Sequence, residues 1–357
     1  MKYSRKEIDR AGFALIGDAD PFKRQQASAL VEDWRKSHWP VLRELKEELI
    51  DLLTKSGVKI EIESHRIKRM QSILEKLQVN KEKKMGLGGL QDIGGLRFVF
   101  SDMDSLSLAM KIIKDYEPTN FELKKTSDYI YENPGPKESG YRSIHFIYKY
   151  KSENKEYDGL QIELQIRTIL QHSWAMAVET ASLISGDSLK ASIDDGSVWR
   201  GFFKLISVIF SKKEGTPLHR DFQHYSEWML CQAYAIYLEG YNLLHKLRAL
   251  QVTVKHEPNV NVEDGYCVLV IDFNRQEVYF QYYGIQDSAL ASDVFADMEK
   301  NSTKDQAVLM VSMSKMSELR KAYPSYFLDA KDFLEALDEF DESCATMFKS
   351  EILKVKP

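Results

Sequence analysis

The sequence predicts a mixed α/β protein, in which a mixed sheet flanked by helices is followed by a small C-terminal α+β unit. Four short strand-like segments lie within residues 96–167, and helical patterns precede, interrupt and follow them. A second pattern of strands and a helix occupies residues 266–311, after the turn-prone run 255–265. We therefore expect two domains, residues 1–252 and 253–357.

The N-terminal part of the chain is predicted to be helical. Residues 24–56 are rich in Leu, Glu, Lys and Ala, and residues 60–77 repeat apolar side chains at helical spacing. The sheet follows, with strands expected at 96–100, 121–125, 144–150 and 159–167 and helices at 103–116 and 168–185.

The last third of the chain differs from the rest in charge. Helices are predicted over residues 199–250, and the terminal unit is expected to have strands at 266–273, 277–283 and 306–311 and helices at 287–300, 314–322 and 330–337. Residues 251–357 carry 11 Lys and Arg against 19 Asp and Glu, whereas residues 1–250 carry 38 against 35. An acidic unit could dock on a basic body, although two separately solvated surfaces would have the same composition.

The composition is that of a soluble globular protein, with 43% hydrophobic and 29% charged residues in 357. No apolar run approaches the ~20 residues that a membrane span needs, and no signal-peptide core follows the N-terminus. A cytoplasmic protein with no membrane partner and no DNA partner is expected. Cys231, Cys267 and Cys344 lie far apart without zinc-binding spacing, which favours buried reduced thiols.

Polar side chains alternate with aliphatic ones along residues 159–168. Gln161, Glu163, Gln165 and Arg167 therefore fall on one face of a strand, and the aliphatic side chains fall on the other. A row of polar groups that contains a carboxylate is typical of a site, but an ordinary solvated strand face has the same pattern.

A second candidate cluster lies upstream. Lys68, Ser72 and Lys76 recur at i, i+4 and i+8, so on a helix they would present cations and a hydroxyl to a triphosphate. A solvated helix face is the alternative. The glycines of residues 85–97 are not a Walker A loop, because no Gly-Lys-Ser/Thr follows and a strand comes next. Asp92, at the entry to that strand, could bind a metal or only form a turn.

Together, residues 66–76, 91–97, 134–145 and 159–168 resemble the nucleotidyl pyrophosphokinase domain of the RelA/SpoT family, which moves the β,γ-pyrophosphate of ATP onto a ribose 3′-hydroxyl. The resemblance implies that fold over residues 60–185. It implies ATP binding by Arg66, Lys68, Ser72, Lys76 and Arg97. It implies acceptor binding by Lys137, Tyr141, Arg142, His145, Gln165 and Arg167, with Tyr141 stacked on a base. It makes Asp92 and Glu163 the catalytic carboxylates and the ligands of Mg²⁺.

In such a transfer, cations and metal neutralise phosphate charge, while a carboxylate holds Mg²⁺ or accepts the proton of the attacking hydroxyl. The sequence has no His-Asp dipeptide, so the hydrolase domain of bifunctional family members is expected to be absent. An enzyme that cannot degrade its product needs another brake.

The tail offers a candidate brake. Residues 319–329 are similar to the Tyr-x-x-Tyr segment of CapRel-type fused toxin-antitoxin proteins, which implies a pseudo-zinc-finger-like domain held over the ATP site by Tyr323 and Tyr326. The resemblance also implies pyrophosphate transfer to the 3′-CCA end of tRNA once a phage protein, such as the major capsid protein, releases the domain. Three alternatives stay open: the two tyrosines are core residues, the chain makes ppGpp or ppApp, or it senses nucleotides without catalysis.

Overall fold

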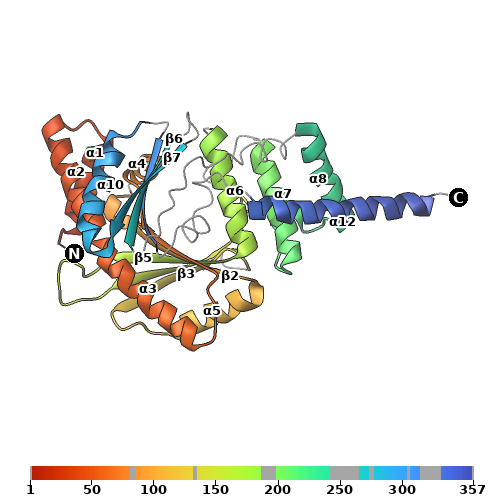
Figure 1. Ribbon diagram of the computed structural model, residues 1–357, viewed down its shortest axis with the longest axis horizontal. Helices are drawn as coiled ribbons and strands as arrows, with labels where there is room; N and C mark the ends of the chain where they lie inside the picture. Colours follow the sequence, from red (N-terminus) through yellow and green to blue (C-terminus); the bar gives the residue numbers. More distant parts are fainter. Residues whose placement is uncertain are drawn as a thin grey trace.

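The computed structural model describes residues 2–80, 85–131, 135–185, 198–241, 265–272, 277–303, 306–313 and 331–355. Figure 1 shows a main sheet, a smaller sheet beside it, and a helical bundle from which the last helix projects. The main helices and strands are α1 (Arg5–Ile16), α2 (Pro21–Lys36), α3 (His38–Lys55), β1 (Ile62–Ile67), α4 (Met70–Val79), β2 (Gly94–Phe100), α5 (Met103–Asp115), β3 (Phe121–Asp128), β4 (Ile144–Tyr150), β5 (Gln161–Thr168), α6 (Ile169–Ser185), α7 (Val198–Lys213), α8 (Glu227–Tyr241), β6 (Gly265–Asp272), β7 (Glu277–Gly284), α10 (Ser288–Asn301), β8 (Gln306–Met313) and α12 (Lys331–Val355). Within these ranges, no helix combines the length and the apolar character that a membrane span requires.

The main sheet has the strand order β1-β2-β5-β4-β3. Strands β2 and β5 run parallel and the other neighbouring pairs are antiparallel, so the sheet is mixed, as predicted. Alternate side chains such as Leu96, Ile162 and Leu164 are fully buried. Helices α3 and α5 contact β2 and β5 and run below the sheet in Figure 1. The residues between these, such as Arg97 and Glu163, are polar and lie on the opposite face of the sheet.

One predicted helix is wrong in its first half. Residues 60–77 are not one helix, because Ile62–Ile67 form β1 and only Met70–Val79 form α4. The strict alternation in residues 60–63 indicates a strand, and antiparallel pairing with β2 satisfies its backbone groups. As a result, Lys68 lies in the turn between β1 and α4.

The C-terminal residues do not pack as one unit. Helix α12 joins α6, α7 and α8 in a separate hydrophobic cluster, in which the ring of Phe333 lies 5.8 Å from those of both Phe203 and Phe210. The short helix expected at 330–337 is thus the start of a long helix that packs on the predicted first domain. The predicted boundary between residues 252 and 253, and the helix expected at 314–322, lie outside the described residues.

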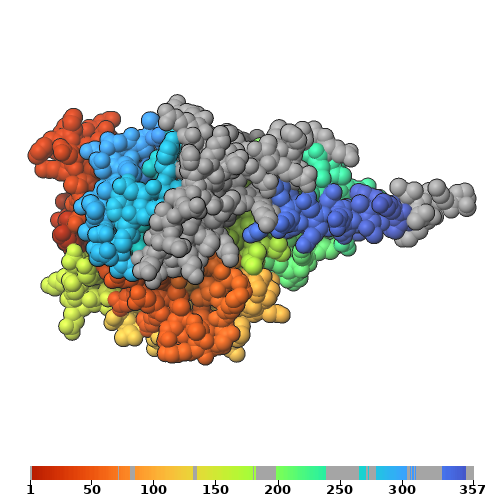
Figure 2. Space-filling model, in the orientation of Figure 1, coloured from red at the N-terminus to blue at the C-terminus, as the bar shows by residue number. Residues whose placement is uncertain are grey.

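Strands β6, β7 and β8 form the predicted small α+β unit with α10. The sheet is antiparallel in the order β7-β6-β8, and Phe295 of α10 packs against Val268 and Met310. Strand β8 lies against β1, and Figure 2 shows the unit next to the N-terminal helices. Lys36 of α2 pairs with Asp293 of α10 at 2.5 Å. The small α+β unit therefore docks on the N-terminal body, which is one of the two outcomes that the charge distribution left open.

The cysteine prediction is wrong for two of the three residues. Cys231 of α8 and Cys344 of α12 form a disulfide with their Cα atoms 5.5 Å apart, while Cys267 is a buried free thiol. The pairing had no signal in the spacing because 113 residues separate the two cysteines. The packing of α12 on α8 brings them together.

Candidate active site

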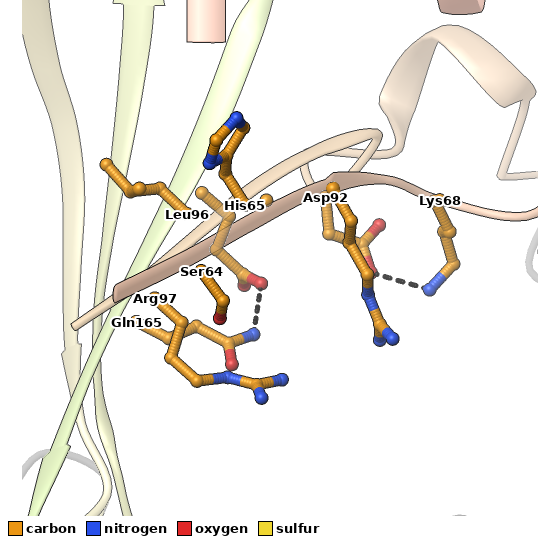
Figure 3. A pocket seen from close by; sticks show the side chains of 10 residues that line it. Ser64, His65, Lys68, Asp92, Leu96, Arg97 and Gln165 are labelled. Carbon is orange, nitrogen blue, oxygen red and sulfur yellow. Dashed lines mark hydrogen bonds and ion pairs between the residues drawn. The ribbon is translucent and has the colours of Figure 1, made fainter. Parts of the chain in front are cut away.

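Two rows of side chains cross β1, β2 and β5 on the polar face of the main sheet. They are Arg66, Gly95 and Glu163 in one row and Ser64, Arg97 and Gln165 in the next. With His65, Lys68, Asp92 and Leu96 they line one pocket, shown in Figure 3. Gly95 keeps the floor of this pocket open, because a Cβ there would meet only the carbonyl oxygen of Arg66, 3.7 Å away.

Asp92 holds two ammonium groups at one end of the pocket. Its Oδ2 lies 3.1 Å from Nζ of Lys68 and 2.8 Å from Nζ of Lys76. Burial alone would raise the pKa of Asp92, but the two lysines outweigh it and lower the pKa to about 2. Burial also lowers the pKa of Lys68. The carboxylate is ionised, and it gathers cations where a polyphosphate can bind.

Glu163 is held through both carboxylate oxygens. Its Oε1 lies 2.9 Å from Nδ1 of His145, and its Oε2 accepts a hydrogen bond of 2.6 Å from Nε2 of Gln165. Burial would raise the pKa of Glu163, but hydrogen bonding to His145 and Gln165 outweighs burial and lowers it. Burial lowers the pKa of His145, so its imidazole is neutral near pH 7. The carboxylate is thus charged and fixed in orientation.

A cluster of aromatic and cationic groups adjoins Glu163. Nζ of Lys137 lies 4.8 Å from the ring centroid of Tyr141 and 4.3 Å from that of Tyr129. The guanidinium of Arg167 lies 5.0 Å from the Tyr141 centroid. Gly140, with φ of +86°, adopts a turn that places Tyr141 here, and a Cβ would lie 2.9 Å from Cβ of Ser207. An aromatic ring flanked by cations suits a nucleobase with nearby phosphates.

Arg142 does not join this cluster, which corrects its predicted role in acceptor binding. Its side chain is only 2% exposed and pairs with Glu214 of α7 at 2.5 Å. It also donates to the hydroxyls of Ser207 and Thr216. A buried guanidinium with three protein partners, one of them a carboxylate, supports the loop that carries Tyr141, rather than reaching a substrate.

The structure brings most of the predicted site residues together. Those that line the pocket are Arg66, Lys68, Asp92, Arg97, Glu163 and Gln165. Those that adjoin it through hydrogen bonds or ring contacts are Lys76, Lys137, Tyr141, His145 and Arg167. Ser72 is half-buried on α4 and does not line the pocket. Tyr323 and Tyr326 lie outside the described residues.

Some site residues were missed. Ser64 and His65 line the pocket, and the alternation of residues 60–63 was the signal that this segment is a strand. Tyr129 lies beside Tyr141 with ring centroids 6.1 Å apart. Tyr129 follows β3 directly but lies four residues beyond the predicted strand at 121–125, and a single aromatic residue there carried no distinctive signal.

The donor set fits a divalent cation. Oδ1 of Asp92 is buried and has no hydrogen-bond partner within the described ranges, while Glu163 lines the same pocket. Carboxylate oxygens are the ligands that Mg²⁺ prefers in phosphoryl-transfer sites. Asp92 and Glu163 are therefore the residues that would hold Mg²⁺, which would supply positive charge to the phosphates.

A known protein family matches the part of the chain that carries this pocket. Residues 65–183 match the region found in RelA / SpoT proteins. That segment runs from β1 to α6 and contains Lys68, Asp92, Glu163 and Tyr141. It is about one third of the chain.

Individual relatives match the same part. The GTP pyrophosphokinase YjbM of Bacillus subtilis (strain 168) is 32% identical over 117 residues, which are 32% of this chain and 53% of that protein. The chain thus spans about half the length of this curated relative. The small alarmone synthetase 1 of Bacillus subtilis, in a crystal structure with its product pppGpp, has a TM-score of 0.41 at 24% identity over 50% of this chain and 88% of that chain. Small alarmone synthetase 2 of the same organism has a TM-score of 0.41 at 22% identity over 51% and 92%.

Proposed function

We propose that the chain is an ATP-dependent pyrophosphokinase that transfers the β,γ-pyrophosphate of ATP to the 3′-hydroxyl of tRNA CCA ends. The transfer is supported chiefly by one observation, the presence of Asp92 and Glu163 in a single pocket with Lys68 and Arg97. The match of residues 65–183 supports the same reaction class. The product would stop translation, which suits a role in anti-phage defence.

The side chains have distinct tasks in this reaction. The 3′-oxygen of the acceptor attacks the β-phosphorus of ATP, the bond from that phosphorus to the oxygen bridging the α-phosphorus breaks, and AMP leaves. Lys68 and Lys76 neutralise the phosphates, since both ammonium groups already converge on one carboxylate oxygen. Glu163 accepts the proton of the 3′-hydroxyl or holds Mg²⁺ with Asp92.

The acceptor distinguishes two candidate functions. The ring of Tyr141 with Lys137 and Arg167 nearby suits a base and phosphates in either a tRNA end or a free nucleotide. The similarity of residues 319–329 to CapRel-type proteins favours tRNA. The Bacillus relative is a GTP pyrophosphokinase by name, which favours the second candidate, synthesis of ppGpp or ppApp.

The reaction and the acceptor are tested together by incubating the purified chain with γ-³²P-labelled ATP and Mg²⁺. Deacylated tRNA, GDP, GTP and adenosine nucleotides are offered separately, and label on tRNA alone is the expected result. Glu163→Gln should lose at least ~10²-fold of the activity, whereas Glu153→Gln, an exposed carboxylate in the loop before β5, should lose none. Full activity of Glu163→Gln would contradict the proposed role of Glu163, and the absence of label on every acceptor would contradict the proposed reaction.

The C-terminal unit is proposed to hold the enzyme inactive. Glu299 of α10 accepts hydrogen bonds from the backbone N–H of Met70, at 2.5 Å, and from Arg35, at 3.1 Å. Met70 begins α4, directly after the turn that carries Lys68. This contact supports a docked unit next to the phosphate side of the pocket. The proposal adds that the unit is pseudo-zinc-finger-like, that Tyr323 and Tyr326 complete its contact, and that a phage protein, such as the major capsid protein, releases it.

Single substitutions test the brake better than a deletion from residue 253, because α12 packs with α6, α7 and α8. An open fraction near 1% corresponds to only about 3 kcal/mol, which the loss of one buried contact can remove. Tyr323→Ala and Glu299→Ala should therefore raise tRNA labelling and arrest growth without phage. Asp297→Ala, an exposed acid on the same helix, is the control. Unchanged labelling by both variants would contradict autoinhibition.

A further inference from the structure

Five side chains next to the pocket form a closed ring of hydrogen bonds, and they are Arg167, Tyr141, His145, Glu163 and Gln165. Nη2 of Arg167 donates to the hydroxyl of Tyr141 at 2.5 Å and to Oε1 of Gln165 at 2.7 Å. The Tyr141 hydroxyl lies 2.8 Å from Nε2 of His145. His145 and Gln165 then each contact one oxygen of Glu163, at 2.9 and 2.6 Å. Two paths therefore run from Arg167 to the same carboxylate.

The direction of every hydrogen bond follows from the chemistry of the groups. A guanidinium only donates and an ionised carboxylate only accepts, so the amide of Gln165 has one possible orientation. The Tyr141 oxygen accepts from Arg167, which directs its single O–H toward Nε2 of His145. Because Nε2 of His145 then accepts, the ring proton is on Nδ1, which donates to Glu163. Each of the five hydrogen bonds of the ring then has one donor and one acceptor.

We propose that Tyr141 and His145 are positioning residues for Glu163, so that the side chain which stacks on the acceptor base also orients the carboxylate. This inference rests on the proposed role of Glu163. The ring of Tyr141 faces the acceptor side with Lys137, while its hydroxyl begins the longer path to Oε1. Movement of this ring on acceptor binding is thereby transmitted to Glu163 through His145. Acceptor recognition and alignment of the carboxylate become one event.

The two tasks of Tyr141 can be separated by substitution. Tyr141→Phe keeps the ring and removes the hydroxyl, so kcat should fall about tenfold while the KM for the acceptor stays within about twofold. Tyr141→Ala removes both and should also raise the KM. His145→Ala should lower kcat, and His145→Asn, which can still donate an N–H near the position of Nδ1, should restore part of it. A purely structural role would not divide kcat and KM in this way.

Coupling is tested with the double variant Tyr141→Phe/His145→Ala. Because both residues lie on one path, the double variant should be no slower than His145→Ala alone. The control is Tyr148→Phe on the same strand as His145, because the Tyr148 hydroxyl is buried and has no hydrogen-bond partner among the described residues. It should keep the kcat of the parent chain.

Two results would overturn the inference. One is an unchanged kcat for Tyr141→Phe, measured in the same assay in which Glu163→Gln is inactive. The other is a double variant whose loss equals the product of the single losses. An active Glu163→Gln would instead refute the proposed role of Glu163, on which this inference rests, so the two failures are distinguishable. If Tyr141→Phe does not fold, the comparison of His145→Asn with His145→Ala decides, and equal kcat values for these two refute the path.

Discussion

Replacing Arg142 by Met should destabilise the folded body rather than weaken acceptor binding. The Arg142 and Glu214 side chains are 2% and 6% exposed, and they contact each other at 2.5 Å. Without the guanidinium, the Glu214 carboxylate keeps two neutral partners among the described residues, Thr168 and Gln171. Removing one member of a buried ion pair costs about 3–5 kcal/mol, because the other charge stays buried and uncompensated. That is a large part of the ~5–15 kcal/mol that stabilises a folded protein.

The assay is urea unfolding followed by tryptophan fluorescence, which reports on the buried Trp174 next to Tyr141. Arg142→Met and Glu214→Gln should each lower the unfolding midpoint strongly. The double variant Arg142→Met/Glu214→Leu should recover part of the loss, because it leaves no unpaired charge. An unchanged midpoint for Arg142→Met, together with a raised acceptor KM, would refute this reasoning and return Arg142 to acceptor binding.

Three further predictions concern the disulfide, the pocket carboxylate and the pocket floor. Closing a loop of 113 residues stabilises the folded chain by at most about 4–5 kcal/mol. Dithiothreitol should therefore lower the melting temperature of the parent chain and of Cys267→Ala, and have no effect on that of Cys344→Ala. An unchanged melting temperature of the parent chain would contradict the disulfide. The pKa of Asp92 in the folded chain, about 2, is below its usual value of 3.8. The difference contributes ~2 kcal/mol to the free energy of unfolding above pH ~4, and this contribution is lost as the pH falls toward 2. Between pH ~4 and ~2 the free energy of unfolding of Asp92→Asn should therefore fall less than that of the parent chain, and an equal fall would disprove the assignment. Gly95→Val should place a branched side chain on the pocket floor between Arg66 of β1 and Glu163 of β5, and so abolish ATP binding in calorimetry. An unchanged ATP affinity would place ATP elsewhere.

Local pattern was enough to predict most of the sheet. Residues 144–150 and 159–167 alternate or run apolar between turn residues, and the structure places β4 and β5 there. The segment at 60–67 was misassigned because its apolar residues also fit a helical period, and only pairing with β2 decides between the two.

Partners distant in sequence explain the remaining errors. Arg142 and Glu214 are 72 residues apart, and Cys231 and Cys344 are 113 apart, so no local pattern marks either pair. A basic residue next to Tyr141 looks equally suited to a phosphate or to a buried carboxylate. The difference depends on whether α7 packs against the loop, which is a property of the tertiary structure. The three pocket residues Lys68, Asp92 and Glu163, by contrast, each sit in or beside a regular strand of the same sheet, and their proximity follows from the strand order.

The turn between β1 and α4 serves both the pocket and the docked unit. The backbone carbonyl of Lys68 accepts a hydrogen bond of 3.1 Å from Nε of Arg35, whose Nη1 pairs with Glu299. Met70, two residues later, donates its N–H to the same Glu299. Glu299, which anchors the C-terminal unit, is thus two hydrogen bonds from the backbone of Lys68, which lines the pocket. If undocking shifts this turn, ATP affinity and docking share one coupling free energy, and each must change the other by the same factor.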